Sequence, residues 1–228
     1  MQFFGKPLRL VILDVDGTIL DLWACFRQNL VTAAQRLSLP IEPIDEYLTN
    51  VRLGTIHGEA ALSEGVRKFW PWLTLVQAHE YSAYFREEEQ RTPYPPVPGA
   101  IEAIQWLRAQ EIPIALCTTN DVPTLEYRLY AAGIDPLWFA ATSTGEYQYR
   151  KPDPRAFDPI FEKLGADRET AVYIGDWYPD VEAARGAGIT FVAVLSGGIP
   201  RHAFIHEGVP EDHIVEGLSN LPNLIAPR

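Results

Sequence analysis

Short runs of consecutive apolar residues alternate along the chain with segments in which apolar residues recur at helical spacing. A run that is apolar at every position is typical of a parallel strand covered on both faces. The intervening segments, such as GAIEAIQWLRAQ (99–110), have apolar residues three and four positions apart, and several end beside a glycine suited to a helix C-cap. The runs are LRLVIL (8–13), IPIALC (112–117), LWFAAT (137–142), TAVYIG (170–175), ITFVAVL (189–195) and, as an edge strand, HIVEGL (213–218); the glycines are Gly133, Gly165 and Gly188. This alternation predicts an α/β fold with a doubly wound, Rossmann-like parallel sheet.

The alternation is interrupted once, between residues 21 and 92. This segment has no good strand pattern, whereas LWACFRQNLVTAAQRL (22–37) has apolar residues at helical spacing and further helical patterns follow it. The next residues, TPYPPVPG (92–99), contain four prolines and predict a stiff connector. We therefore expect an α/β core of residues 1–20 and 93–228, with an all-helical cap domain inserted at residues 21–92.

The composition excludes several classes of protein. With 228 residues, 47% of them hydrophobic, the chain can bury a substantial core. Its net charge of -11 disfavours a general attraction to nucleic acid or to an anionic membrane. No apolar segment is long enough to span a membrane, the first run ends at Asp14, too early for a secretory signal, and the cysteines, Cys25 and Cys117, lie far apart. We therefore expect a cytoplasmic protein without nucleic-acid or membrane partners.

Polar residues directly follow several of the predicted strands. Ligands of open α/β sheets bind beyond the carboxyl ends of the strands, so these residues are candidates for a functional site. They are Asp14, Asp16, Gly17 and Thr18 after the first run; Thr118, Thr119 and Asn120 after the second; Lys151, in YRKPDP, beyond the third; and Asp176 and Asp180, in GDWYPD, after the fourth. We expect these residues to converge on one edge of the sheet.

Clustered carboxylates in an acidic protein indicate a bound hard cation. Mg²⁺ takes oxygen ligands, commonly one or two carboxylates together with a substrate phosphate. Without a cation, a phosphate dianion about 4 Å from one carboxylate would be repelled by about 8 kcal/mol at an effective dielectric constant of about 20. Mg²⁺ and Lys151 would offset this charge, and the Thr118 hydroxyl and backbone N–H groups near Gly17 and Thr119 could hold the phosphoryl oxygens. One aspartate of the DVD segment (14–16) could then attack phosphorus while the other exchanges the leaving-group proton.

In chain order, the segments DVDGT, TTN, KPDP and GDWYPD resemble the four motifs of the haloacid dehalogenase-like superfamily. The resemblance covers essentially the whole chain, and the helical insert is similar to the small cap of the phosphoglycolate-phosphatase-like branch. It implies that Asp14 is the nucleophile and that Asp16 is the general acid and then the base for the hydrolytic water. It also implies that Thr118 and Lys151 bind and neutralise the phosphoryl group.

The resemblance further implies a Mg²⁺ site formed by Asp14, the backbone carbonyl of Asp16, and Asp176, with Asp180 nearby. Asp180 keeps a second interpretation, because an aspartate that opens the helical segment DVEAARGAG could be a plain helix N-cap. Trp177 departs from the small polar residue expected after Asp176, and would narrow the metal side of the site.

Substrate recognition is expected from Gly17, Thr119, Asn120 and Arg52. Arg52, in NVRLGTIHG, lies near Gly54 at a break between helical patterns, which predicts a loop. A guanidinium group there could pair with a carboxylate or second phosphate of a small acidic substrate. A solvated surface arginine is the alternative interpretation.

These features and the resemblance predict a Mg²⁺-dependent phosphomonoester hydrolase that acts on a small phosphorylated metabolite through an aspartyl-phosphate. A phosphomutase acting on a sugar phosphate would use the same intermediate, since only the acceptor of the phosphoryl group differs. A catalytically silent binding protein is a third interpretation, although every expected catalytic side chain is present. A dehalogenase is disfavoured, because halide displacement needs no leaving-group acid at Asp16.

Overall fold

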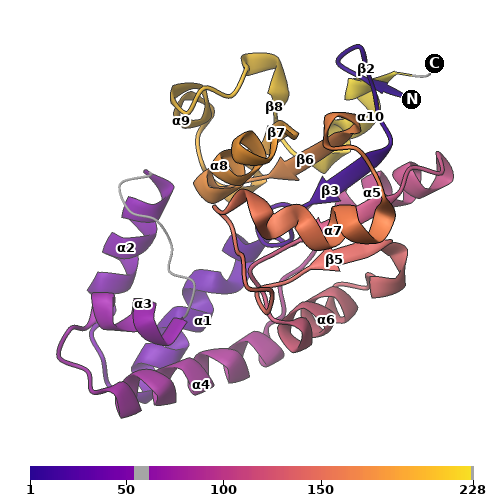
Figure 1. Ribbon diagram of the computed structural model, residues 1–228. Helices are drawn as coiled ribbons and strands as arrows, with labels where there is room; N and C mark the ends of the chain where they lie inside the picture. The colour runs from indigo at the N-terminus through magenta and orange to yellow at the C-terminus, as the bar shows by residue number, and fades with distance from the viewer. Residues whose placement is uncertain (54–61, 227–228) are drawn as a thin grey trace. The chain divides into compact units, whose positions relative to one another are not determined.

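The computed structural model describes residues 1–53 and 62–226, which form two compact units (Figure 1). The α/β core unit comprises Met1–Asp21 and Pro95–Arg228, and the helical unit comprises Leu22–Tyr94. None of the described helices combines the length and the apolar character needed to cross a membrane.

The core unit contains a six-stranded sheet whose neighbouring strands pair in parallel. The strand order is β5-β4-β3-β6-β7-β8, with β3 (Leu10–Leu13), β4 (Ile114–Cys117), β5 (Ala141–Ser143), β6 (Ala171–Gly175), β7 (Thr190–Val194) and β8 (Ile214–Val215). The order changes direction at β3, which lies between β4 and β6, as in a doubly wound sheet. The predicted α/β fold is therefore confirmed, with the HIVEGL segment at the sheet edge.

The α/β core unit also contains helices. They are α5 (Ala100–Ala109), α6 (Val122–Ala131), α7 (Asp158–Leu164), α8 (Tyr178–Ala187), α9 (Arg201–His206) and α10 (Leu221–Leu224). Residues of α7 and α8 belong to one hydrophobic cluster with Ile12 and Tyr173, and Figure 1 shows these two helices in front of the strands. Val11 and Leu13 alternate with Ile12 toward the opposite face and are also fully buried, so both faces of β3 are covered. This burial explains why the strands are apolar at consecutive positions.

Two features of the core differ from the sequence prediction. Residues 137–140 are not in a strand, because Pro136–Trp138 forms a 3-10 helix whose Leu137 N–H is capped by the Asp135 carboxylate at 2.9 Å. A small antiparallel sheet, ordered β2-β1-β9, is absent from the sequence prediction. Its strands, β1 (Gln2–Phe3), β2 (Lys6–Pro7) and β9 (Ile225–Ala226), have two residues each, which is too short for an apolar pattern to be recognised.

The core segments on either side of the insertion are hydrogen-bonded neighbours. The Asp21 N–H donates to the Pro95 carbonyl at 2.8 Å, and the Val97 N–H donates to the Ile19 carbonyl at 2.8 Å. The chain therefore leaves the core and returns to it through two paired segments, of which the second is rich in proline.

The described residues of the helical unit form α1 (Leu22–Arg36), α2 (Glu42–Arg52), α3 (Leu62–Phe69) and α4 (Leu75–Arg91). The hydrophobic core of this unit includes Leu30, Trp70 and Tyr81. The Tyr81 hydroxyl donates to the Leu30 carbonyl at 3.0 Å, and the Trp70 indole N–H donates to the Pro40 carbonyl at 3.1 Å. The polar atoms of both buried rings are thus paired, and the insert has a core of its own.

Candidate active site

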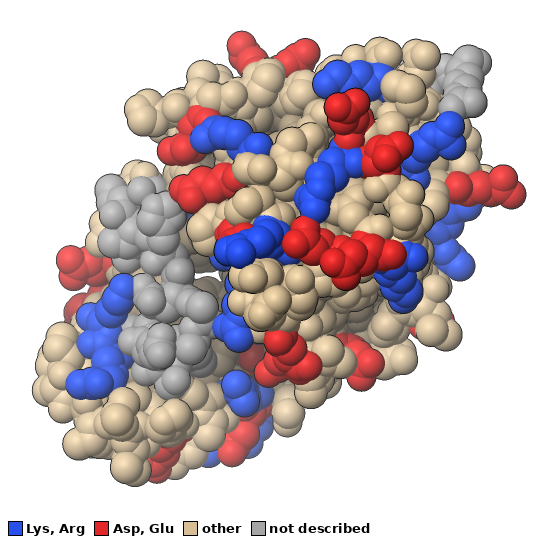
Figure 2. Space-filling view, viewed as in Figure 1, with Lys and Arg blue, Asp and Glu red and all other residues tan. Residues whose placement is uncertain are grey.

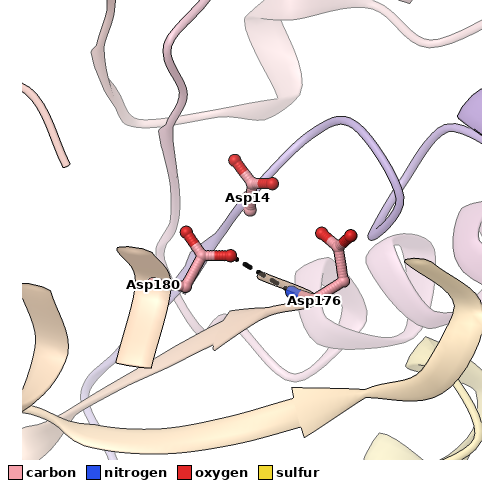
Figure 3. A group of neighbouring side chains, drawn as sticks. All are labelled: Asp14, Asp176 and Asp180. Atoms are coloured by element: carbon pink, nitrogen blue, oxygen red, sulfur yellow. Dashed lines mark hydrogen bonds between the residues drawn. The ribbon is translucent and has the colours of Figure 1, made fainter. Parts of the chain in front are cut away.

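Three buried carboxylates meet at the carboxyl edge of the parallel sheet. Asp14 follows β3, Asp176 follows β6, and Asp180 lies in the first turn of α8. One oxygen atom from each carboxylate lies within 4.8 Å of the others, and Figure 3 shows the three side chains together. Because β3 and β6 pair in parallel, with Leu13 opposite Ile174, the residues that follow both strands emerge side by side.

Lys151 supplies a buried positive charge to this cluster. Its ammonium group donates to Asp14 Oδ1 at 2.7 Å, to Asp180 Oδ1 at 2.6 Å and to the Tyr173 hydroxyl at 2.8 Å. An ammonium group has three N–H bonds, so these three acceptors satisfy it. One positive charge faces three carboxylates, and the cluster therefore keeps an excess of negative charge when all three are ionised.

Asp180 organises the cluster through both of its carboxylate oxygens. In addition to Lys151, Oδ1 accepts the Tyr173 hydroxyl at 2.8 Å. Oδ2 accepts the backbone N–H groups of Asp176 at 3.2 Å and Trp177 at 2.9 Å. Asp180 is the third residue of α8, whereas Trp177 occupies the N-cap position, so the N-cap interpretation of Asp180 is wrong. The carboxylate instead fixes the turn between β6 and α8 and the position of the lysine.

Asp176 lies in a pocket of small residues from two other strand ends. Its Oδ1 accepts the Thr18 hydroxyl at 3.0 Å. A Cβ atom added to Gly17 would lie 2.1 Å from Asp176 Oδ2, and one added to Gly197 would lie 1.8 Å from the same oxygen. The Ser196 hydroxyl donates to the Gly17 carbonyl at 2.6 Å and ties the segment after β7 to the turn after β3. Side chains larger than hydrogen at either glycine would displace the Asp176 carboxylate.

Asp16 has different surroundings from Asp14, although only Val15 separates them. Its Oδ2 accepts the Arg128 guanidinium at 2.7 Å and the Asn120 side-chain amide at 2.8 Å. The backbone N–H of Asn120 in turn donates to the buried Thr118 hydroxyl at 3.1 Å. The two aspartates of the DVD segment therefore interact with different cations, an ammonium for Asp14 and a guanidinium for Asp16.

Burial and mutual repulsion dominate the electrostatics of the cluster. Burial, opposed in part by Lys151, raises the pKa of Asp14 to about 7. Burial together with the nearby carboxylates raises the pKa of Asp176 well above its usual range. Burial alone would lower the pKa of Lys151, but the carboxylates of Asp14 and Asp180 raise it above its ordinary value. The donor set of close, buried carboxylate oxygens fits a hard divalent cation, which would stabilise the ionised forms.

Sequence reasoning missed several residues that shape this site. Ser196 and Gly197 directly follow the apolar run ITFVAVL (189–195), so the rule that singles out strand ends would have found them had it been applied to that run. The sequence does not mark Tyr173 or Arg128 as site residues. Tyr173 lies within an apolar strand, and Arg128 lies within an amphipathic helix.

Two predicted residues lie in unexpected settings. Arg52 is the last residue of α2, so the predicted loop is wrong at that position, while Gly54 lies outside the described residues. The Arg52 guanidinium lies 4.5 Å from the centre of the Trp23 ring, as in a cation–π contact. The Trp177 side chain packs, partly buried, against the hydrophobic cluster of the core. Among the other predicted substrate-binding residues, Thr119 is exposed and its carbonyl lies against Gly145.

Acidic and basic side chains are interspersed over the core unit on the face drawn in Figure 2. Several charged residues form ion pairs, such as Arg168 with Asp158 at 2.6 Å. On this face, an anionic ligand would therefore be attracted by local charges rather than by a broad basic surface.

The chain is similar to known hydrolases in both sequence and fold. Residues 8–188 match the family model of the haloacid dehalogenase-like hydrolases. The chain is 33% identical over 204 residues to the phosphoglycolate phosphatase of Mesorhizobium japonicum, covering 87% of this chain and 86% of that protein. It is 29% identical over 205 residues to the phosphoglycolate phosphatase of Agrobacterium fabrum, covering 85% and 83% of the two chains. The solved structure of a predicted phosphoglycolate phosphatase from Haemophilus somnus has the same fold, with a TM-score of 0.76 at 22% identity and coverage of 95% and 97%.

Proposed function

Because the chain belongs to the haloacid dehalogenase-like hydrolases, we propose that it is a Mg²⁺-dependent phosphomonoester hydrolase that forms an aspartyl-phosphate. The observation that carries this proposal is the different environment of two aspartates at one strand end. Asp14 lies in the carboxylate cluster against Lys151, whereas Asp16 is held by Arg128 outside that cluster. Such a pair suits two roles, since a nucleophile can stay ionised among the ligands of a divalent cation, while an acid outside that cluster can exchange its proton.

Mg²⁺ would be held by the carboxylates of Asp14 and Asp176 and by the backbone carbonyl of Asp16. We place Asp180 beside these ligands and not among them, because its two carboxylate oxygens already accept four hydrogen bonds. When bound, the ion would neutralise the excess negative charge and polarise the phosphoryl group.

The residues of the chain divide the reaction between them. A carboxylate oxygen of Asp14 attacks phosphorus, and Asp16 gives a proton to the leaving oxygen as the P–O bond breaks. Asp16 then takes a proton from the water that attacks the aspartyl-phosphate, which releases phosphate and restores Asp14. Lys151 and the Thr118 hydroxyl would hold the phosphoryl oxygens. Because three acceptors already satisfy the Lys151 ammonium, it must exchange one of them to do so.

The relatives named as phosphoglycolate phosphatases make 2-phosphoglycolate the first substrate to test. We place Gly17, Thr119 and Asn120 at the phosphoryl side of the substrate, since they follow the strands that carry the catalytic residues. Arg52 is proposed to recognise the acidic part of the leaving group, because a guanidinium group pairs well with a carboxylate.

The test is a panel of phosphomonoesters that includes 2-phosphoglycolate, hexose phosphates and 4-nitrophenyl phosphate, with released phosphate and isomerised product scored separately. We expect Mg²⁺-dependent phosphate release that a chelator abolishes, and no turnover by Asp14→Asn. Isomerisation of a sugar phosphate without phosphate release would establish the phosphomutase alternative. Full turnover in chelator would exclude the proposed mechanism.

A further inference from the structure

Within the described part of the chain, Asp16 is anchored through only one of its two carboxylate oxygens. Oδ2 accepts hydrogen bonds from the Arg128 guanidinium at 2.7 Å and from the Asn120 amide at 2.8 Å. The same guanidinium nitrogen donates to the Asn120 side-chain carbonyl at 3.0 Å, so the three side chains form a closed triangle. Oδ1 is buried and has no hydrogen-bond partner among the residues that the structure describes.

This asymmetry distinguishes the two oxygens chemically. A proton on Oδ2 would compete with two donors that already point at that atom, one of them charged. A proton on Oδ1 would meet no such competition. Buried polar atoms in folded proteins are nearly always paired, so an unpaired carboxylate oxygen in this place indicates an atom kept available for a ligand.

We propose that Arg128, together with Asn120, is a positioning residue that makes Oδ1 of Asp16 the atom that carries the catalytic proton. This inference rests on the proposed function, in which Asp16 is the acid and then the base. In the first step the Oδ1–H bond breaks and its proton passes to the leaving alkoxide oxygen while Asp14 bonds to phosphorus. In the second step Oδ1 takes a proton from the attacking water, which regenerates the acid and releases phosphate.

The local fold makes Arg128 suitable for this task. It lies roughly two turns into α6, and its side chain is only 11% exposed, so its conformation is restricted by packing. Asn120 directly precedes the N-cap residue of the same helix, Asp121, whose carboxylate accepts the Thr124 N–H at 2.9 Å. Both residues that hold Asp16 are therefore positioned by the same helix, Arg128 within it and Asn120 just before it.

The competing role for Arg128 is direct binding of an acidic leaving group. The two roles differ in kinetics, because a binding residue acts mainly on KM whereas a residue that orients an acid acts on kcat. They also differ in their dependence on the leaving group. Loss of a positioned acid matters most when the departing oxygen is a poor leaving group, such as an alkoxide.

The experiment compares Arg128→Met and Arg128→Lys with the wild-type protein on 2-phosphoglycolate and on 4-nitrophenyl phosphate, in saturating Mg²⁺. We expect Arg128→Met to lower kcat on 2-phosphoglycolate by about ten- to a hundredfold, with KM changed less than about threefold, and to affect 4-nitrophenyl phosphate by less than about fivefold. Arg128→Lys should recover part of the loss, because it keeps the charge but not the planar geometry. Arg168→Met, which removes the ion pair with Asp158, is the matched control and should leave both activities unchanged.

A double-mutant cycle with Asp16→Asn separates positioning from a general effect on the fold. If Arg128 acts through Asp16, adding Arg128→Met to Asp16→Asn should cost less than about twofold further. Asn120→Ala serves as a second variant that loosens the same anchor, and thermal melting verifies that each variant is folded. Equal losses on both substrates, a change confined to KM, or additive losses in the cycle would overturn this inference alone. Absence of turnover by the wild-type protein on every phosphomonoester would overturn the proposed function instead.

Discussion

The ammonium of Lys151 lies 2.7 Å from a carboxylate oxygen of Asp14, and both side chains are at least nine-tenths buried. Among the described residues, the ion pairs of the carboxylate cluster are those of Lys151 with Asp14 and with Asp180. The charge of Lys151 therefore offsets part of the mutual repulsion of these carboxylates in the folded protein.

Replacement of Lys151 by methionine should destabilise the metal-free protein and abolish turnover. Removing one member of a buried ion pair leaves uncompensated carboxylates and typically costs about 3–5 kcal/mol. Chemical denaturation in a chelator measures this loss. Lys163→Met, at an exposed position of α7, is the control and should change the free energy of unfolding by less than about 0.5 kcal/mol. An equally small change for Lys151→Met would show that the carboxylates are neutral in the metal-free protein.

The stability of the metal-free protein should fall as the pH rises from about 5 to 8. Burial raises the pKa of Asp14 from 3.8 to about 7, so the folded protein binds this proton more tightly than the unfolded chain. The group therefore favours folding at low pH, and its contribution is lost as the pH rises through about 7. This difference between the pKa of Asp14 in the folded and in the unfolded chain lowers the free energy of unfolding at pH 8 by up to about 4 kcal/mol. Melting temperatures in chelator should show the fall, and Mg²⁺ should reverse it at pH 8.

Asp14→Asn tests the assignment of that pH dependence. The variant has no titrating group at this position, so its metal-free form should melt at a higher temperature than the wild type at pH 8 and lose part of the slope between pH 5 and 8. The remaining slope belongs to Asp176, whose pKa is raised in the same direction by burial. An unchanged slope in Asp14→Asn would assign the effect to other groups.

Gly197→Ala should weaken metal binding by displacing the Asp176 side chain. The added Cβ would lie 1.8 Å from Asp176 Oδ2, so the carboxylate must move. We expect the Mg²⁺ concentration for half-maximal activity to rise by about tenfold or more, as for other changes around metal ligands. Gly217→Ala is the matched control, since its nearest neighbour would be a Val97 methyl at 3.9 Å. Equal metal dependence of the two variants would show that Asp176 is not a ligand.

Arg52→Ala tests substrate recognition by the helical unit. If Arg52 pairs with an acidic leaving group, the ratio of kcat/KM for 2-phosphoglycolate to that for 4-nitrophenyl phosphate should fall by about tenfold, or about 1.4 kcal/mol. Arg67→Ala, at an exposed position of α3, controls for the loss of a positive charge from the same unit. A constant ratio would return Arg52 to a structural role beside Trp23.

The sequence by itself determined the α/β core and the meeting of its main carboxylates. Consecutive apolar residues identify strands buried on both faces, and in a parallel sheet the residues after neighbouring strands must emerge at one edge. The positions of Asp14 and Asp176 follow from this rule, because β3 and β6 are neighbours. This rule says nothing about residues away from the strand ends. The prediction of a strand from consecutive apolar residues was itself wrong at residues 137–140, because Asp135 and Pro136 start a 3-10 helix there.

Only the tertiary structure decided what each carboxylate contacts. Arg128 and Asp16 are 112 positions apart, and Thr18 and Asp176 are 158 apart, so no local periodicity links them. Asp180 could be a ligand or a cap by sequence, but the fold surrounds it with two side-chain donors and two backbone donors. Such contacts depend on how loops from separate strands and the helices that follow them pack together, which is a property of the whole core rather than of any segment.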